Sequence, residues 1–354
     1  MMAMAGQSNL MRGGRSTLRR TAIICLALLI GLLLAIVLSS LIGTERLPVG
    51  SSLCVLFSGG NSPCGLTDKE SKFLFDILFV VRLPRILLAA GVGASLAAAG
   101  AGYQALLRNP LAEPYLLGIS NGAAVGTMIA LVFFGTNYEN EWLRPLMAFA
   151  GALASTFVVY QLARGRTGAS PEKLILAGVI VTTFLSSAIV FITTLMDATR
   201  IRSFTFWLLG DLSGASSTLL LVAIIAALVG ALVLALHARP LNLLMLGERD
   251  AFDLGVEVER VRLTVFLAAS LLVGASVASS GSVGYVGLVV PHLVRLSVGS
   301  DNRTVIPAAA LAGALFVIVA DTIARTVIAP RELPVGAITA LIGAPLFIYL
   351  LRRG

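Results

Sequence analysis

The sequence predicts an all-α membrane protein, a helical bundle with about ten transmembrane helices. Of its 354 residues, 57% are hydrophobic and only 12% are charged, whereas a soluble domain carries about 25% charged residues. The apolar residues form long continuous runs, and ~20 such residues are enough to cross the ~30 Å hydrocarbon core of a bilayer. Since only helices and closed barrels satisfy the backbone in lipid, continuous runs of this length favour helices.

Ten runs are expected to span. The first, residues 21–42, follows a basic N-terminal stretch and is too long for the apolar core of a signal peptide. The other nine spans are expected at 84–107, 115–134, 145–163, 174–195, 217–236, 261–281, 283–298, 304–325 and 335–351. The span at 283–298 is the least typical, because it is short and contains Pro291, His292 and Arg295. The patch FLFDILFVV at 73–81 is too short to cross and is expected at the membrane surface.

The basic residues indicate the orientation. With the N-terminus inside, ten spans put both termini in the cytoplasm, and 16 of the 26 Lys and Arg residues then fall inside, as the positive-inside rule requires. Because these residues sit at span ends, the net charge of +8 does not indicate nucleic-acid binding. We expect one transmembrane domain over residues 1–354, with a cytoplasmic basic tail (1–20), a periplasmic loop (43–81) and a cytoplasmic segment (239–262).

Glycine and alanine are dense in several spans, which predicts close helix packing. Three cysteines are present. Cys25 lies in the first span, where it is expected to pack as an inert side chain. Cys54 and Cys64 share the outer loop and could form a disulfide in an oxidising compartment, or stay as two free thiols.

Enzymatic motifs are missing from the sequence. The two histidines are far apart, and neither HExxH, CxxC nor the phosphate loop GxxxxGK[ST] occurs. We therefore expect no metal site, no catalysis by this chain and no ATP hydrolysis of its own. Asp321 and Glu113 are acids at or near spans, as in ion-coupled transporters, but Asp321 could equally pair with Arg325 one helical turn later, and that structural role is favoured.

Two polar stretches interrupt the apolar pattern. In RNPLAEPYLLGISNGAAVG (108–126), Pro110 and Pro114 end the second span and shape the approach to the third. In RPLNLLMLGERDAFDLGVEVERVR (239–262), apolar residues at helical spacing alternate with charges, and Gly247 and Gly255 are predicted to divide it into two short helices. This second stretch is either an interfacial amphipathic helix or a docking element with apolar anchors inside a charged rim.

Seven stretches together carry a family resemblance. In order, they are RLPR (82–85), RNPLAEPYLLGISNGAA (108–124), FWLLGDLSG (206–214), LNLLMLGERDAFDLGV (241–256), GSVGYVGLVVPHLVRLSVGSDNR (281–303), ADTIAR (320–325) and ELPVGAITALIGAPLFIYLL (332–351). They cover nearly everything after residue 80. On these motifs the chain resembles the FecCD-type permease subunits of bacterial ABC importers for iron chelates and vitamin B12.

The resemblance implies a type II ABC importer permease that dimerises around a central path in the bacterial inner membrane. Its implied partners are a second permease copy, two ATPase subunits that bind ATP and Mg²⁺, a periplasmic substrate-binding protein and membrane lipid. The chain itself would bind no cofactor. The sequence leaves open whether the dimer is a homodimer or a heterodimer.

The resemblance also assigns residue roles. Arg82, Arg85 and Arg325 would receive carboxylates of the binding protein, since guanidinium groups pair with them bidentately; the alternative is snorkelling to the lipid interface. Asn109 and Leu111 match one cytoplasmic gate element, and Pro171 and Glu172 the other, although small hydroxyl residues stand there in the vitamin B12 permease. The ATPase-coupling residues would be Leu243, Leu246, Gly247, Glu248, Arg249, Asp250, Phe252, Leu254 and Gly255.

We therefore expect a permease subunit that moves a ferric siderophore-type chelate at the expense of ATP hydrolysed by its partner. Cobalamin and haem are the alternative substrates within the same family. An ion-coupled secondary transporter, or a membrane scaffold without a conducting path, are the alternatives from other functional classes.

Overall fold

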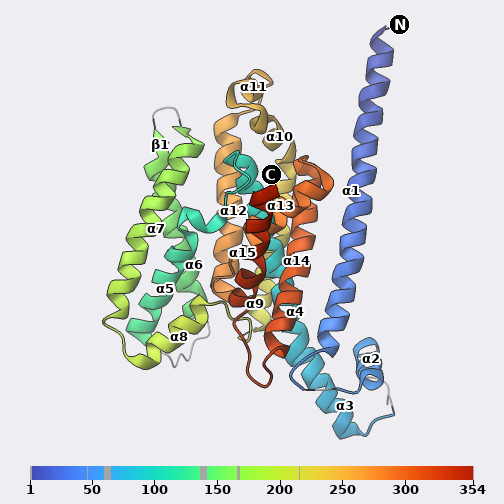
Figure 1. The fold of residues 1–354 in the computed structure, drawn as a ribbon, viewed down its shortest axis with the longest axis vertical. Coiled ribbons are helices and arrows are strands. Elements are labelled where there is room, and N and C mark those ends of the chain that lie inside the picture. Colours follow the sequence, from blue (N-terminus) through green and yellow to red (C-terminus); the bar gives the residue numbers. More distant parts are fainter. Residues whose placement is uncertain are drawn as a thin grey trace.

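Long helices running in two directions make up most of the computed structural model, which describes residues 2–45, 47–59, 65–135, 142–165, 168–214 and 216–353 (Figure 1). In chain order the elements are α1 (Met2–Leu41), α2 (Val49–Ser58), α3 (Asp68–Phe75), the π-helix η1 (Asp76–Arg82), α4 (Leu83–Leu106), the 3₁₀-helix η2 (Pro114–Leu117), α5 (Ile119–Phe134), α6 (Leu143–Ala163), β1 (Arg164–Gly165), β2 (Gly168–Ala169), α7 (Pro171–Thr193), α8 (Ala198–Leu208), α9 (Ser217–Leu236), α10 (Ala238–Leu246), α11 (Glu248–Asp253), α12 (Val258–Ser280), α13 (Val286–Val298), α14 (Asn302–Thr326) and α15 (Val335–Arg353).

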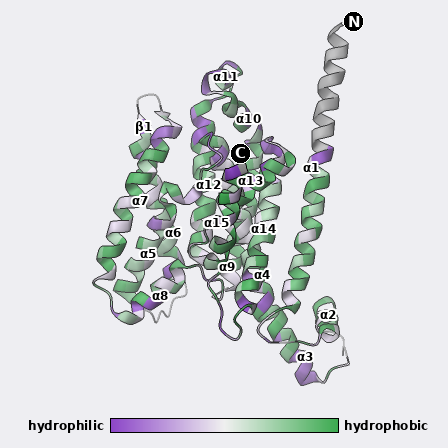
Figure 2. Ribbon diagram, viewed as in Figure 1, coloured by the Kyte–Doolittle hydropathy of each residue, from purple (hydrophilic) through white to green (hydrophobic). Residues whose placement is uncertain are grey.

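The ten expected spans coincide with α1, α4, α5, α6, α7, α9, α12, α13, α14 and α15. Among the described residues, six helices have both the length and the composition to cross a membrane: α1 from Arg19, α6, α7, α9, α12 and α14. At 1.5 Å per residue, a helix of 20 residues reaches about 30 Å. Figure 2 shows hydrophobic residues along the middle of the helices and hydrophilic residues gathered at their two ends. The predicted helical membrane bundle is confirmed.

Helix α4 lies at the centre of the bundle, packed against α9, α12, α13 and α14. Eighteen of its 24 residues are buried, most of them alanine and glycine. The backbones of α4 and α14 touch where Gly93 meets Gly313, and a Cβ added to either glycine would collide with the carbonyl oxygen of the other. Such contacts bring two helices close enough for extensive van der Waals packing, which is the role expected for the small residues.

Both chain termini lie at the same end of the bundle, together with β1 and α11, while α3 and α8 lie at the opposite end (Figure 1). We call the first the inner end and the second the outer end, following the orientation expected from the basic residues. An even number of spans accounts for this arrangement. At the inner end, α10 and α11 are separated by Gly247, whose φ of 148° suits glycine. The predicted division of this segment into two short helices is confirmed.

The outer end holds more helix than the sequence predicts. The apolar patch at 73–81 does not stand apart at a surface but continues through α3 and η1 directly into α4. Its residues Leu74 and Leu78 are buried against Val55 of α2. Helix α3 begins at a capping box, in which the Glu70 carboxylate accepts hydrogen bonds from the Thr67 backbone N–H (2.9 Å) and hydroxyl (2.8 Å). These bonds hold the pKa of Glu70 below its ordinary value.

The expected cysteine chemistry falls partly outside the described residues. Cys25 is a free, half-buried thiol of α1. Cys54 lies in α2, whereas Cys64 is outside the described residues. The disulfide between Cys54 and Cys64 stays a prediction.

Replacing Gly93 by alanine should destabilise the bundle. The new methyl group would collide with the Gly313 carbonyl, and overpacking of this kind costs roughly 1–3 kcal/mol. We expect the thermal inactivation midpoint in detergent to fall by several degrees, measured as the loss of the monodisperse peak after heating.

Gly91→Ala is the matched control, two residues earlier on the same helix. A Cβ there would meet Ala223 at an ordinary 3.4 Å. Equal midpoints for the two variants would contradict the importance of the α4–α14 contact.

Candidate functional site

The segment at 107–118 turns the chain from α4 into α5 at the inner end. Arg108 follows α4 with a φ of 50°, unusual for a residue other than glycine. Asn109 forms the next turn, donating its N–H to the Gln104 carbonyl (3.1 Å) and accepting the Leu111 N–H on its side-chain oxygen (2.9 Å). We call residues 107–118 the gate segment, after the role expected from the sequence. Asn109 is therefore what shapes the start of this segment.

The gate segment is anchored to the loop between α12 and α13. The Tyr115 hydroxyl donates to the Val283 carbonyl (2.9 Å) and accepts from the Val283 N–H (3.0 Å). A Glu113 carboxylate oxygen accepts the Tyr285 N–H at 3.2 Å. Irregular backbone is tolerated at membrane depth where protein groups satisfy its hydrogen bonds. These side-chain bonds explain how a stretch with two prolines can lie among apolar helices.

The second expected gate element lies beside the first. Strands β1 and β2 form a short antiparallel hairpin, after which Ser170 caps α7 by accepting the Lys173 N–H at 3.4 Å. Pro171 is buried in the first turn of α7, and Glu172 is exposed. The η2 turn packs on α7. The structure therefore brings both gate elements to the same end, and their gating role stays a prediction.

Helices α10 and α11 form what we call the coupling segment, residues 238–253, which projects at the inner end (Figure 1). Its inward residues Leu241, Leu244 and Ala251 are buried. In contrast, Leu246 and Phe252 are each 70% exposed, and Leu254 directly after α11 is 63% exposed. The neighbouring charged residues are Glu248, Arg249 and Asp250. Exposed apolar anchors beside charges are typical of a protein-binding surface.

Two asparagine side chains fix the coupling segment to the bundle. The Asn242 side chain donates to the Asp301 carboxylate (2.7 Å) and accepts from the backbone and side-chain nitrogens of Asn302 (2.9 and 2.8 Å). Asn302 is fully buried at the start of α14 and also accepts from Arg295 of α13 at 3.0 Å. Helix α10 is thus held by hydrogen bonds to the first turn of α14.

Five charged side chains gather between the coupling segment and the gate, and we call them the inner ion cluster: Arg108, Glu172, Glu248, Glu259 and Arg262. Arg262 is 4% exposed and pairs with Glu248 (2.6 Å) and Glu259 (2.8 Å). The same Glu248 oxygen lies 3.7 Å from Arg108. The Tyr160 hydroxyl of α6 donates to Glu259 at 3.0 Å. The cluster joins α6, α11, α12 and the gate segment.

A second cluster of charges lies at the outer end, formed by Arg82, Arg85, Asp321, Arg325 and Glu332, which we call the outer arginine cluster. Asp321, which is 1% exposed, pairs with Arg85 (2.9 Å) and, through its other oxygen, with Arg325 as an ion pair at 3.0 Å. The structural role favoured for Asp321 is therefore confirmed. Its carboxylate compensates two guanidinium groups at once.

The three arginines differ in accessibility. Arg82 is 4% exposed and donates to the Ser40 and Glu45 carbonyls (2.8 and 2.7 Å), and Arg325 is 5% exposed. Arg85 alone also pairs with an exposed acid, Glu332, at 2.7 Å. Arg85 and Glu332 line a cavity of about 220 Å³ formed with residues 206, 210–213 and 333–335. In this structure Arg85 is the arginine best placed to meet a partner, and the docking role of the three stays a prediction.

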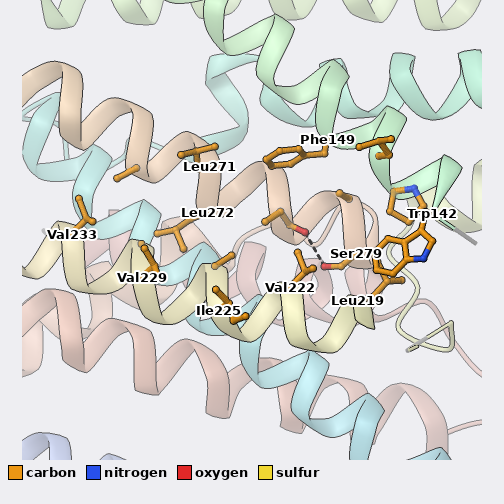
Figure 3. Close-up of a pocket in the computed structure, with 17 residues that line it drawn as sticks. Trp142, Phe149, Leu219, Val222, Ile225, Val229, Val233, Leu271, Leu272 and Ser279 are labelled. Carbon is orange, nitrogen blue, oxygen red and sulfur yellow. Dashed lines mark hydrogen bonds between the residues drawn. The ribbon is translucent and has the colours of Figure 1, made fainter. Parts of the chain in front are cut away.

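A larger cavity, of about 540 Å³, lies between α6, α9 and α12 (Figure 3). Figure 3 shows Phe149 and Trp142 facing a row of side chains from α9 that includes Val222 and Ile225. Ser279 is a polar exception, but its hydroxyl already donates within its own helix, to Ala275 and Ser276. The lining suits hydrocarbon, since burying a polar ligand here would cost its hydrogen bonds with water.

A polar stripe on α5 and α7 was not predicted. Asn121 donates to the Thr182 carbonyl (3.1 Å) and the Ser186 hydroxyl (2.7 Å). Thr183, Ser186 and Ser187 are exposed on α7, a helix that is long and apolar enough to cross a membrane. Polar groups inside a membrane usually face a water-filled path or another protein helix. The signal was the run TTFLSSA at 182–188.

Within the described residues, no group of three His, Cys, Asp or Glu side chains could hold a metal ion.

Known proteins resemble this chain along most of its length. Residues 29–353 match the FecCD transport family. The hemin transport system permease protein of Yersinia pestis is 42% identical, covering 79% of this chain and 84% of that protein. The cobalamin import system permease protein of Halobacterium salinarum is 44% identical, covering 78% and 73%.

Solved structures share the fold. A transporter described as of the metal-chelate type of ABC transporter, in an inward-facing conformation, superposes with a TM-score of 0.81 at 31% identity, covering 94% of this chain and 100% of that one. PsaBC from Streptococcus pneumoniae in complex with Fab gives a TM-score of 0.54 at 14% identity, covering 79% and 94%, and shows a likeness of fold alone. With a family match over residues 29–353 and relatives above 40% identity, the chain belongs to the FecCD transport family.

Proposed function

We propose that this multi-pass membrane protein is the permease subunit of an ATP-driven importer for a large metal chelate. The observation that carries the proposal is the coupling segment, which together with the adjoining Leu254 presents Leu246 and Phe252 to the surroundings at the inner end. Apolar side chains of this size, outside the membrane-spanning helices and flanked by charges, need a protein partner to cover them. An ATPase subunit is the partner that transport by this family requires.

The outer arginine cluster supports docking of an acidic partner on the other side. Three arginines gather at this place, and Arg85 lines the outer cavity beside its exposed ion-pair partner Glu332. Positive charge around a cavity attracts carboxylates and sets the register of docking. An exposed carboxylate of a substrate-binding protein would replace Glu332 as the ion-pair partner of Arg85. In this scheme Arg82 and Arg325 contribute charge from beneath the surface.

The polar stripe of Asn121, Thr183, Ser186 and Ser187 supports a path between two permease copies rather than within one chain. Hydroxyl and amide groups would make weak contacts with a passing chelate, and affinity would reside in the binding protein. The substrate proposed first from the sequence is a ferric siderophore. Relatives named for hemin and cobalamin support these two macrocycles equally as substrates.

The proposed arrangement places the inner end in the cytoplasm and the outer end outside the cell membrane. Residues 1–354 then form one permease domain, with a cytoplasmic tail at 1–20, an outer loop at 43–81 and the cytoplasmic segment at 239–262. Asn109, Leu111, Pro171 and Glu172 would form the cytoplasmic gate. A dimer of two copies is the simplest assembly.

Transport itself is the direct test of the proposal. Vesicles holding the permease, its ATPase and internal ATP, with binding protein outside, should accumulate one of ferric siderophore, hemin or cyanocobalamin. Uptake should stop when ATP or the ATPase is omitted, because the chain has no phosphate loop. Radiolabelled uptake is the measurement. Uptake that persists without the ATPase would instead favour a secondary transporter, and no uptake under any condition would favour a scaffold.

Substitution of Phe252 by serine should weaken ATPase docking. Loss of a buried aromatic anchor costs ~2 kcal/mol or more, so the ATPase affinity of permease nanodiscs should fall at least about thirtyfold. Phe57→Ser is the control, since Phe57 is 77% exposed on α2 at the outer end. If Phe252→Ser binds the ATPase as tightly as the wild type does, the coupling role is refuted.

Two substitutions at the outer end should act in opposite directions. Arg85→Gln should weaken the binding of the substrate-binding protein, and Glu332→Gln should strengthen it by freeing Arg85 from its 2.7 Å ion pair. Each change should be roughly two- to fivefold at low salt, because an exposed pair contributes up to about 1 kcal/mol, and smaller at high salt. Titration by biolayer interferometry measures both.

Arg331→Gln is the control for these two variants, as it removes an exposed charge beside Glu332. General damage to the fold cannot raise affinity, so a gain for Glu332→Gln is diagnostic. Weaker binding of both variants would contradict carboxylate exchange on Arg85.

A further inference from the structure

We propose that the inner ion cluster transmits movement of the coupling segment to the gate segment, with Arg108 and Arg262 as positioning residues. This inference rests on the proposed function, because it assumes that an ATPase docks on the coupling segment. It adds the side chains that would carry the movement, which neither the family match nor the exposed apolar anchors identify.

Glu248 is the central group of this connection. It is the first residue of α11, and one of its carboxylate oxygens lies 2.6 Å from Arg262 and 3.7 Å from Arg108. Arg108 directly precedes Asn109, whose turn starts the gate segment. A displacement of α11 therefore moves the carboxylate of Glu248 relative to the guanidinium group of Arg108, which belongs to the gate segment.

Arg262 makes the connection stiff. Its side chain is buried, and it links Glu248 of α11 with Glu259 on its own helix, which in turn accepts from Tyr160 of α6. Separating a buried arginine from its carboxylates leaves an uncompensated charge, and breaking such a pair costs several times more than breaking an exposed one. The groups must therefore move together or exchange partners.

Exchange is available because Arg262 contacts two acids, Glu248 and Glu259, while Arg108 lies near only one of them, Glu248. Arg108 is beyond ordinary hydrogen-bond distance of Glu248, and both Arg108 and Arg262 act electrostatically on Glu172. Glu172 belongs to the second gate element, in the first turn of α7. In this structure Arg108 lies near Glu248 of the coupling segment, and the proposed movement would transfer it to Glu172 of the second gate element. Two such pairings give a discrete switch instead of a continuous deformation.

The structure also offers variants that separate transmission from docking. The Asn242 bonds hold α10 to α14 independently of the cluster, so loss of Arg108 should leave the ATPase-binding surface in place. Arg260 provides the matched control. It lies two residues before Arg262 on α12, is 79% exposed and pairs only weakly with Glu257, at 3.4 Å.

The experiment follows two spin labels in the assembled permease–ATPase complex in nanodiscs. One label replaces Leu111 in the gate segment, which is 41% exposed, and the other replaces the exposed Asp253 in α11. The three native cysteines are replaced by serine. Double electron–electron resonance gives the distance between equivalent labels of the two permease copies, with and without ATP and vanadate.

In the wild type, ATP should shift both distances. In Arg108→Gln and Arg262→Gln the Asp253 label should still respond, while the ratio of moved to unmoved Leu111 labels should fall about five- to tenfold, the lower end of the range of typical couplings between sites. ATPase affinity should be unchanged in Arg108→Gln. Arg260→Gln should behave as the wild type.

The outcomes separate the two proposals. If ATP and vanadate do not change the distance between the Asp253 labels in the wild-type complex, the coupling function and this inference are both overturned. A normal Leu111 response in Arg108→Gln would overturn the inference alone. Because Arg108 is 35% exposed at its side chain, that variant should fold even if Arg262→Gln does not.

Discussion

The backbone contact between α4 and α14 at Gly93 and Gly313 is the constraint on which the rest of the molecule depends. It fixes the central helix of the bundle, and that helix carries functional groups at both ends. Arg82 and Arg85 flank its start, whereas Arg108 and Asn109 follow its last turn. Because a helix of 24 residues packed on four neighbours behaves as a rigid element, the spacing between the outer arginine cluster and the gate segment is set by this packing.

The two charged clusters solve different electrostatic problems. At the outer end, the buried Asp321 compensates Arg85 and Arg325, and Arg82 relies on backbone carbonyls. Arg85 can exchange Glu332 for the carboxylate of a partner, because Glu332 is the exposed member of their ion pair. At the inner end, Arg262 pairs with two carboxylates, so it keeps one when the other moves away. Desolvation makes buried charges costly when single but tolerable when paired, and the second carboxylate permits exchange at Arg262 without an unpaired intermediate.

Much of the fold could be predicted from the sequence, because the hydropathy of each span is a local property. Gly247 and Gly255 likewise indicated the break that yields α10 and α11. Helices α2, α3 and α8 were not predicted, although Thr67 with Glu70 is a readable capping box and Asp197 caps α8. The ion pairs could not be deduced, since Arg85 lies 236 residues from Asp321 and Arg108 is likewise remote in sequence from Glu248. The inaccessibility of Arg82 and Arg325 is also a tertiary property, which a basic motif alone cannot reveal.

Coupling between sites is reciprocal, and this constrains how both ends can act through α4. If ATP favours one pairing of Arg108, that pairing must in turn favour ATP binding by the same factor. A partner whose carboxylate replaces Glu332 at Arg85 changes the electrostatic surroundings of the first turn of α4. The other end of α4 lies next to Arg108. It can bias the gate only if its contacts differ between the two arrangements of the bundle. The carboxylate of Asp321 joins α4 to α14 at the outer end through its ion pair with Arg85. It is too deeply buried for a docking partner to displace it. Any relative movement of α4 and α14 must therefore either preserve the ion pairs of Asp321 with Arg85 and Arg325 or leave a buried arginine without a carboxylate partner. The second course is expensive, so the gate is expected to open by movements of α5, α7 and the coupling segment around a fixed α4–α14 pair.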